Sequence, residues 1–145
     1  MKFQRIDHVG INVKDIAAAK AFFLDLGFEL MGEMDAEGEL FDRVTGLKGV
    51  RDRIVMLRIP GAEANIELVQ FYNPPPEGDI RDFPANGLGV SHISFAVEDI
   101  DGIVARMVEK GMRAFSEIQN YEGIYKVCYV HGPEGIILEL AEKIG

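Results

Sequence analysis

The sequence has too few cysteines to form a disulfide that would stabilise its fold. It contains one cysteine, Cys128, and no tryptophan among its 145 residues. A single cysteine cannot form a disulfide within the chain, so the fold must depend on its apolar core. The length is typical of one domain and allows about 70% of the unfolded surface to be buried. We therefore expect a single-domain protein of a reducing compartment, the cytoplasm.

Basic residues are in the minority. The chain has 15 Lys and Arg against 24 Asp and Glu, which gives a formal net charge of −9. Nucleic-acid phosphates require a basic face, and membrane surfaces attract basic clusters. The sequence also lacks both a signal-peptide pattern and an apolar run approaching about 18 residues. We therefore expect neither nucleic acid nor a membrane as a partner.

One motif occurs twice in the chain. Residues 5–15 read RIDHVGINVKD and residues 89–99 read GVSHISFAVED, so the histidines His8 and His92 occupy the same place in each copy. In both copies alternating apolar residues indicate a strand, and the final aspartate precedes a helical pattern. An internal repeat of this kind indicates two copies of one supersecondary unit.

Each copy is expected to contain a strand, a helix and three further strands. The first copy has predicted strands at 6–13, 28–34, 53–60 and 64–72, and a helix at 16–26. The second has strands at 90–97, 113–118, 124–131 and 135–142, and a helix at 100–110. Residues 35–53 are expected to form a charged loop. The predicted fold is α+β: two tandem βαβββ modules, 4–73 and 89–142, joined by a Pro- and Gly-rich linker, 74–88, within one domain spanning 1–145.

Each copy also ends on a glutamate between two apolar residues. Glu67 lies in Ile-Glu-Leu and Glu139 lies in Leu-Glu-Leu, so alternation turns both carboxylates away from the apolar face. If the copies lie side by side about a pseudo-twofold axis, two imidazoles and two carboxylates converge. A divalent cation would offset the cost of burying the carboxylates. Two nitrogens and two oxygens suit Mn, Fe, Co, Ni or Zn better than Ca or Mg, which predicts one transition metal held by His8, Glu67, His92 and Glu139.

Each of these positions has a plainer interpretation when taken alone. A lone strand histidine is usually a hydrogen-bonded structural group, and a lone strand glutamate is usually a surface charge. The occurrence of both residue types at matching places in two copies favours metal ligands instead. His131 has no counterpart in the repeat and is therefore interpreted as structural.

The paired modules resemble the vicinal oxygen chelate superfamily. The resemblance rests on a histidine in the first strand and a glutamate in the last strand of each module, and it covers about residues 4–142. The segment 132–140, GPEGIILEL, is similar to the family's Asp-Pro-Asp-Gly-x-x-x-Glu-Leu. Members include glyoxalase I, methylmalonyl-CoA epimerase, extradiol dioxygenases, and fosfomycin and bleomycin resistance proteins. The resemblance implies a cupped mixed sheet around a metal site, the same four ligands, and a homodimer.

The resemblance also implies an activity. It favours a metal-dependent glyoxalase-like lyase or isomerase, or an epimerase, that transfers a proton next to a carbonyl through a metal-chelated enediolate. The expected substrate is a small chelating, oxygen-rich compound or a thioester. Glu139 is the first candidate for the catalytic base and Glu67 the second. Two alternatives stay open: an extradiol-type Fe(II) dioxygenase, and a drug-binding antibiotic-resistance protein of the same fold.

Two residues depart from the glyoxalase I pattern. Glyoxalase I sequences usually carry an asparagine four residues after the first-module glutamate, where this chain has Phe71. They often carry a basic residue directly after the final turn, where this chain has Ile136. Since the asparagine helps to hold glutathione, these departures argue against glutathione use.

Overall fold

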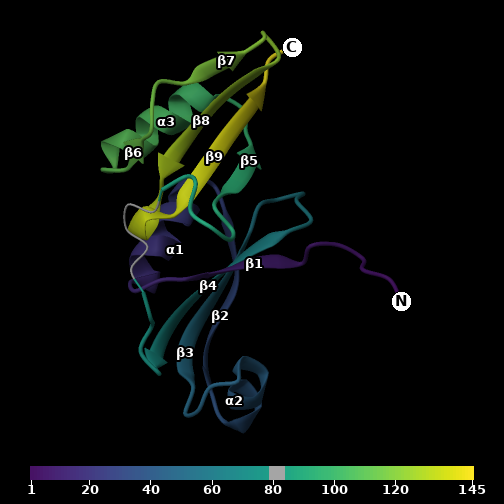
Figure 1. Cartoon of the computed structure of the whole chain (residues 1–145), viewed down its shortest axis with the longest axis vertical. Helices are drawn as coiled ribbons and strands as arrows, with labels where there is room; N and C mark the ends of the chain where they lie inside the picture. Colours follow the sequence, from purple (N-terminus) through teal and green to yellow (C-terminus); the bar gives the residue numbers. More distant parts are fainter. Residues whose placement is uncertain (79–83) are drawn as a thin grey trace. The chain divides into compact units, whose positions relative to one another are not determined.

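The computed structural model describes residues 1–78 and 84–145, which belong to two compact units, Met1–Gly78 and Asp79–Gly145. Figure 1 shows the elements of each unit along the chain. Part of the predicted linker 74–88, residues 79–83, lies outside the described residues. The assignment of both modules to one domain stays a prediction.

The first unit contains one mixed sheet of four strands. Its elements are β1 (His8–Asn12), α1 (Ile16–Asp25), β2 (Glu29–Glu37), α2 (Glu39–Thr45), β3 (Arg51–Arg58) and β4 (Asn65–Asn73). The strand order is β1-β4-β3-β2, with β1 parallel to β4 and the other neighbours antiparallel. The first and last strands of the module are therefore adjacent in the sheet.

The second unit repeats this topology. Its elements are β5 (Ile93–Ala96), α3 (Ile100–Glu109), β6 (Arg113–Ala114), β7 (Gln119–Tyr121), β8 (Tyr125–His131), a 3-10 turn (Pro133–Gly135) and β9 (Ile137–Lys143). The strand order is β5-β9-β8-β6, with β7 also paired to β8, and β5 is parallel to β9. The two mixed sheets with few helices confirm the predicted α+β class, and the sequence repeat corresponds to a repeated topology.

The same capping interaction begins the long helix of each unit. Asp15 accepts a hydrogen bond from the Ala18 backbone N–H at 3.0 Å, and Asp99 accepts one from the Gly102 N–H at 3.1 Å. Such caps satisfy N–H groups that have no partner within the helix. The predicted starts of both helices, directly after these aspartates, are therefore confirmed.

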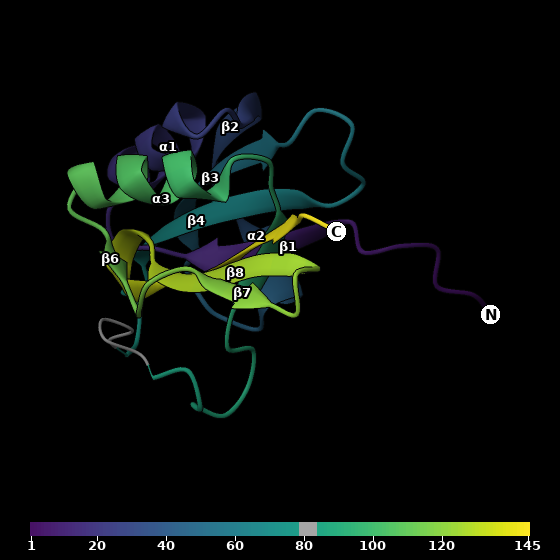
Figure 2. The ribbon, with the colours of Figure 1, turned by 90° about the horizontal axis from the view of Figure 1, so that it is seen from above.

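Within each unit the helix packs on one face of its own sheet, as Figure 2 shows for α1 and α3. The apolar residues of that interface are buried. In the first unit they include Phe23, Leu57 and Leu68, and in the second unit they include Ile100, Met107 and Leu138, each at most 1% exposed. Burying a large apolar side chain contributes roughly 1.5–3 kcal/mol. The helix-covered faces therefore form the cores, and the opposite faces are left for other contacts.

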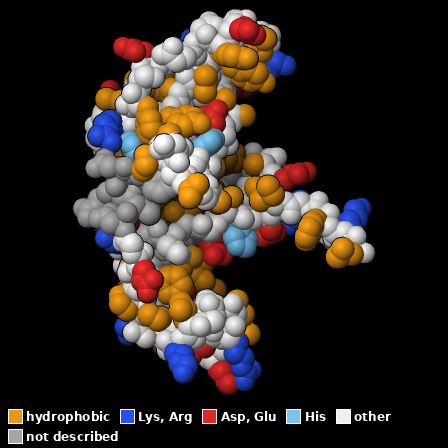
Figure 3. Space-filling view, viewed as in Figure 1, with side chains coloured by type: hydrophobic (Ala, Val, Ile, Leu, Met, Phe, Trp, Pro, Cys, Tyr) orange, Lys and Arg blue, Asp and Glu red, His pale blue; other side chains and the backbone are white. Residues whose placement is uncertain are grey.

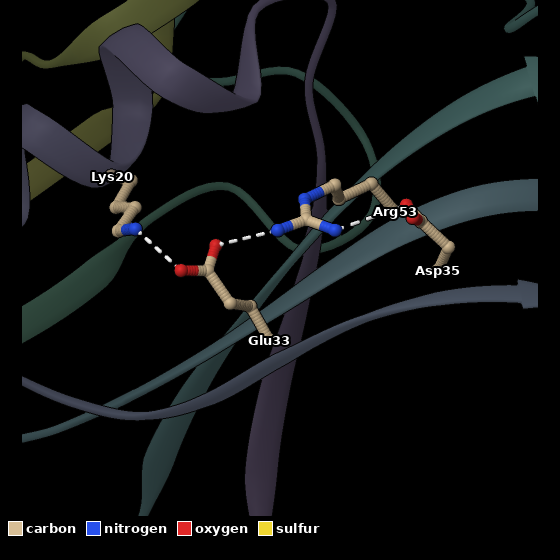
Figure 4. A network of polar contacts seen from close by, with 4 residues as sticks. All are labelled: Lys20, Glu33, Asp35 and Arg53. Carbon is tan, nitrogen blue, oxygen red and sulfur yellow. Dashed lines mark hydrogen bonds and ion pairs between the residues drawn. The ribbon is translucent and has the colours of Figure 1, made fainter.

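Hydrogen bonds between charged side chains also connect α1 to its sheet. Lys20 of α1 donates to Glu33 of β2 at 2.7 Å, and Arg53 of β3 donates to Glu33 at 3.0 Å and to Asp35 at 3.1 Å (Figure 4). The Lys20 and Arg53 hydrogen bonds lower the pKa of Glu33. The network thus joins a helix and two strands on the covered side of the sheet.

The prediction of a charged loop at 35–53 was wrong. Asp35 and Arg53, which bound it, are partners in the β2–β3 ladder, and β2 continues to Glu37. The segment between these strands contains α2, and every residue of α2 is at least partly exposed. Leu40, Phe41 and Val44 do lie at helical spacing within α2, but the charged residues around them were interpreted as a loop. Asp42 of α2 accepts backbone hydrogen bonds from Gly49 and Val50, which stabilises the turn into β3.

Smaller differences occur in the second unit. The strand predicted at 90–97 begins only at Ile93, so His92 lies directly before β5, and the short strand β7 was not predicted. Among residues 1–78 and 84–145, the structure shows no helix long and apolar enough to cross a membrane.

Candidate metal site

In the first unit, strand register brings His8 and Glu67 together. Because β1 and β4 are parallel with Gly10 opposite Glu67, His8 lies two residues along the same face as Gly10. His8 Nε2 is 3.6 Å from Glu67 Oε2, and the two side chains are 38% and 23% exposed. The pair lies on the face opposite α1, because the neighbouring residues Ile66 and Leu68 are buried.

In the second unit, His92 and Glu139 form the matching pair. Ser94 of β5 lies opposite Glu139 of β9, as Gly10 lies opposite Glu67 in the first unit. His92 Nε2 is 2.9 Å from Glu139 Oε2, with side-chain exposures of 30% and 23%. Histidine side chains reach the surface in the space-filling view (Figure 3). The four predicted residues thus occur as two His–Glu pairs, one in each unit.

The second nitrogen of each ring also has a partner, which the sequence reasoning missed. Asp7 Oδ2 is 2.9 Å from His8 Nδ1, and Arg5 donates to the other oxygen of Asp7 at 3.0 Å. Ser91 Oγ is 2.7 Å from His92 Nδ1. Asp7 and Ser91 occupy the same place in the sequence repeat, so the repeat contained the signal that could have identified them.

The Asp7 hydrogen bond changes the protonation of the first pair. It raises the pKa of His8, and the charge of Glu67 adds to the rise, while partial burial opposes it. The same hydrogen bond lowers the pKa of Asp7, assisted by Arg5. Asp7 is therefore ionised at neutral pH and accepts hydrogen bonds from both neighbours.

Aromatic rings adjoin the second pair. Tyr129 of β8 is in register with Glu139, and its ring centroid lies 4.9 Å from that of His92. Phe115 lies 5.7 Å from Tyr129 and 4.5 Å from His131. His131 Nδ1 is also 3.0 Å from the Gly135 carbonyl oxygen, an arrangement that agrees with a structural role. Aromatic rings therefore lie on the same face of the sheet as Glu139.

A buried carboxylate, Asp52 of β3, was also missed. The residue is 4% exposed, and its Oδ1 has no hydrogen-bond partner among the residues that the structure describes. Met56 is in register with Glu67, so alternation places Asp52 on the Glu67 face, farther along β3. Burial raises the pKa of Asp52, and the Glu67 charge raises it further. Asp52 lies between Arg51 and Arg53 in the predicted charged loop, and this pattern gave no signal of burial.

The donor atoms of each pair fit one transition-metal ion. Two ligand atoms bound to the same ion at about 2.0–2.1 Å lie roughly 2.8–3.6 Å apart when the angle at the ion is about 90–120°. The observed separations are 3.6 and 2.9 Å. Imidazole nitrogen and carboxylate oxygen together suit Zn, Fe, Co, Ni or Mn. Over the described ranges, no group of three or more His, Cys, Asp or Glu is arranged to hold a metal. Binding of one ion by both pairs therefore stays a prediction.

The chain is similar to known proteins over nearly its whole length. It is 30% identical over 142 residues to the uncharacterized protein YwbC of Bacillus subtilis (strain 168), which covers 97% of this chain and 98% of YwbC. The glyoxalase family protein APC24694 from Bacillus cereus is 40% identical, with a TM-score of 0.96, covering 100% of this chain and 97% of that one. The trypanothione-dependent glyoxalase I of Leishmania major shares the fold, with a TM-score of 0.68 at 20% identity over 97% of this chain and 87% of that one.

The match to a family model is equally extensive. Residues 5–140 match the model of the Glyoxalase/Bleomycin resistance protein/Dioxygenase superfamily. This range contains both His–Glu pairs and every strand except the end of β9. The superfamily includes enzymes such as glyoxalase I, and it often uses a divalent metal. The repeated topology, the extent of the match and the likeness to the Bacillus proteins agree: this chain belongs to the Glyoxalase/Bleomycin resistance protein/Dioxygenase superfamily.

Proposed function

We propose that the protein is a metal-dependent lyase or isomerase that transfers a proton next to a carbonyl group. One divalent transition metal would be held by His8, Glu67, His92 and Glu139. The observation that supports this is the pairing of a histidine with a glutamate at matching strand positions in both units, with Nε2–Oε2 separations of 3.6 and 2.9 Å. Isolated surface residues would not be expected to form the same His–Glu pair at matching positions in both units.

When bound, the ion supplies positive charge that stabilises the negative charge developing on a substrate oxygen. The chain itself would move the proton. A carboxylate oxygen of Glu139 accepts the proton from the carbon next to the carbonyl, with Glu67 as the second candidate. Return of the proton to the neighbouring carbon gives an isomer, and return to the opposite face of the same carbon gives an epimer. Tyr129 beside His92 would limit the access of water to this side of the site.

The proposed substrate is a small molecule with two neighbouring oxygens, or a thioester. Phe71 lies on the Glu67 face of β4, where an apolar ring offers no hydrogen bond to glutathione, and Ile136 offers no charge. We therefore expect glutathione adducts to be poor substrates. We also propose a cytoplasmic homodimer.

Metal content tests the ligand set. The protein is purified without added metal and analysed by mass spectrometry beside His8→Ala, Glu139→Ala and His131→Ala. We expect one equivalent of transition metal in the wild type, its loss in the first two variants and its retention in His131→Ala, the matched control. Wild-type protein that takes up no metal even when metal is added would refute the site.

Activity is tested on α-oxo thioesters, hemithioacetals and acyl-CoA epimers with each metal. In D2O, the carbon next to the carbonyl should acquire deuterium, and His92→Ala should abolish both metal binding and turnover. Turnover at the wild-type rate in metal-stripped protein would contradict the mechanism. Oxygen uptake with a catechol would indicate an extradiol dioxygenase instead, and tight drug binding without metal would indicate a binding protein.

A further inference from the structure

The two His–Glu pairs differ at the ring nitrogen that faces away from the glutamate. Nδ1 of His8 faces the carboxylate of Asp7, whereas Nδ1 of His92 faces the hydroxyl of Ser91. An ionised carboxylate can only accept a hydrogen bond, but a hydroxyl can either donate or accept. Because a neutral imidazole carries one proton, the partner of one nitrogen determines what the other can do.

In the first unit the partners favour a proton on Nδ1. Asp7 requires a donor at 2.9 Å, so a neutral His8 presents N–H to Asp7 and a lone pair at Nε2. The distance from Nε2 to Glu67 Oε2 is 3.6 Å, which is longer than a hydrogen bond. A lone pair facing a carboxylate oxygen would produce this separation, because both atoms are acceptors.

In the second unit the distances favour the opposite arrangement. Nε2 of His92 lies 2.9 Å from Glu139 Oε2, which is a hydrogen-bond distance. Without an ion between them two acceptors would repel at this distance, so the metal-free pair requires a donor on the ring. A neutral His92 with its proton on Nε2 then accepts a hydrogen bond at Nδ1, and the Ser91 hydroxyl at 2.7 Å can donate it. The same ring position that is a free lone pair in the first unit is therefore an N–H in the second.

We propose that the two histidines adopt opposite neutral tautomers, and that Asp7 and Ser91 are the positioning residues that determine them. His8 carries its proton on Nδ1 and His92 carries it on Nε2. This inference rests on the proposed function, and it means that only one of the two neutral rings presents a lone pair at Nε2 to a metal. Nε2 of neutral His8 carries a free lone pair. Nε2 of neutral His92 gains one only after it releases its proton to solvent, Nδ1 takes up a proton, and the Ser91 hydroxyl changes from donor to acceptor.

The tautomers can be read directly by NMR without any metal. Long-range ¹H–¹⁵N correlations of ¹⁵N-labelled, metal-stripped protein at about pH 9, where histidine is neutral, distinguish Nδ1–H from Nε2–H. We expect Nδ1–H for His8 and Nε2–H for His92. His131 serves as an internal reference for Nδ1–H, because its Nδ1 faces the Gly135 carbonyl oxygen, which can only accept. The same tautomer at His8 and His92 would overturn the inference.

Substitutions at the two positioning residues separate their roles from general folding. In Asp7→Asn the side chain can still accept from Nδ1–H, so His8 should keep its tautomer, whereas Asp7→Leu should lose it. Ser91→Asp should convert His92 to the Nδ1–H form. An unchanged His8 tautomer in Asp7→Leu, or an unchanged His92 tautomer in Ser91→Asp, would contradict the assignment of the positioning role.

Titration with Zn²⁺ or Co²⁺ extends the test to the metal. Removing a hydrogen bond to a ligating histidine typically weakens metal binding 10–100-fold, so Asp7→Leu should show about that loss and Asp7→Asn should recover most of it. A protein with the two expected tautomers that binds no metal would contradict the proposed function alone. A protein that binds metal but has one tautomer at both rings would contradict this inference alone.

Discussion

Replacing Asp52 with asparagine should stabilise the protein at neutral pH. Asp52 is 4% exposed, and its Oδ1 has no hydrogen-bond partner among the described residues. Burial and the nearby charge of Glu67 both raise its pKa. The ionised form is therefore disfavoured in the folded state relative to the unfolded chain, in which water solvates it.

The sign of the pH dependence follows from proton binding. Between the ordinary aspartate pKa and the raised folded value, the folded state binds more protons than the unfolded state, so stability falls as pH rises through this window and stays lower above it. The asparagine side chain of the variant does not titrate. A buried unsatisfied polar group costs about 1–3 kcal/mol. The cost is larger when the group is charged. The asparagine oxygen remains unpaired, so Asp52→Asn removes only the added cost of the charge, and we expect a gain of about 1 kcal/mol at pH 8.

Urea unfolding in the presence of a chelator measures this gain. Far-UV circular dichroism is the suitable signal, because the chain has no tryptophan. The stability difference between Asp52→Asn and wild type should grow from pH 4 to pH 8. Glu63→Gln is the matched control, since Glu63 is an exposed carboxylate between β3 and β4. A gain that does not change with pH, or a loss of stability at pH 8, would refute the assignment of a buried carboxylate with an unpaired Oδ1.

Three further predictions concern the cores and a helix cap. Phe23→Ala should cost about 3–5 kcal/mol in urea unfolding, because the Phe23 side chain of α1 is fully buried. Gly102→Ala should destabilise the protein by roughly 1 kcal/mol, although alanine favours helices. A Cβ at this position would lie 2.3 Å from Asp99 Oδ2 and displace the cap. Thermal unfolding of this variant is compared with that of Gly32→Ala, where a Cβ meets open space. Cys128 is buried and burial raises the pKa of its thiol, so it should react with a disulfide reagent far more slowly in the folded protein than in urea.

The sequence predicted the features that local patterns determine. The aspartate caps, the alternation around Glu67 and Glu139, and the duplicated order of strands and helices were all visible in short windows. The repeat added the long-range information, because two copies of one pattern imply two copies of one topology. The His–Glu pairing within each unit follows from the parallel contact of first and last strands, which alternation alone does not supply.

The parts that were missed depend on contacts between segments distant in sequence. The segment from Asp35 to Arg53 was assigned to a loop because its charges indicate solvent, yet the β2–β3 pairing brings these two end residues together. Asp52 lies between two arginines, so only the fold reveals that its side chain is buried. The partner of a histidine ring depends on side-chain rotamers, so the roles of Asp7 and Ser91 required distances.

The duplication provides an internal comparison for the chemistry of the site. The ladder places Glu67 opposite Gly10 and Glu139 opposite Ser94, so the two glutamates occupy matching register positions. The two rings differ in the partner of Nδ1, a carboxylate in one copy and a hydroxyl in the other, and Tyr129 lies beside His92. An exchange of these two side chains alters the electrostatics of each pair while the sheet is retained. A change in metal affinity upon exchange would therefore measure the combined contribution of the hydrogen bond and the charge beside each ring.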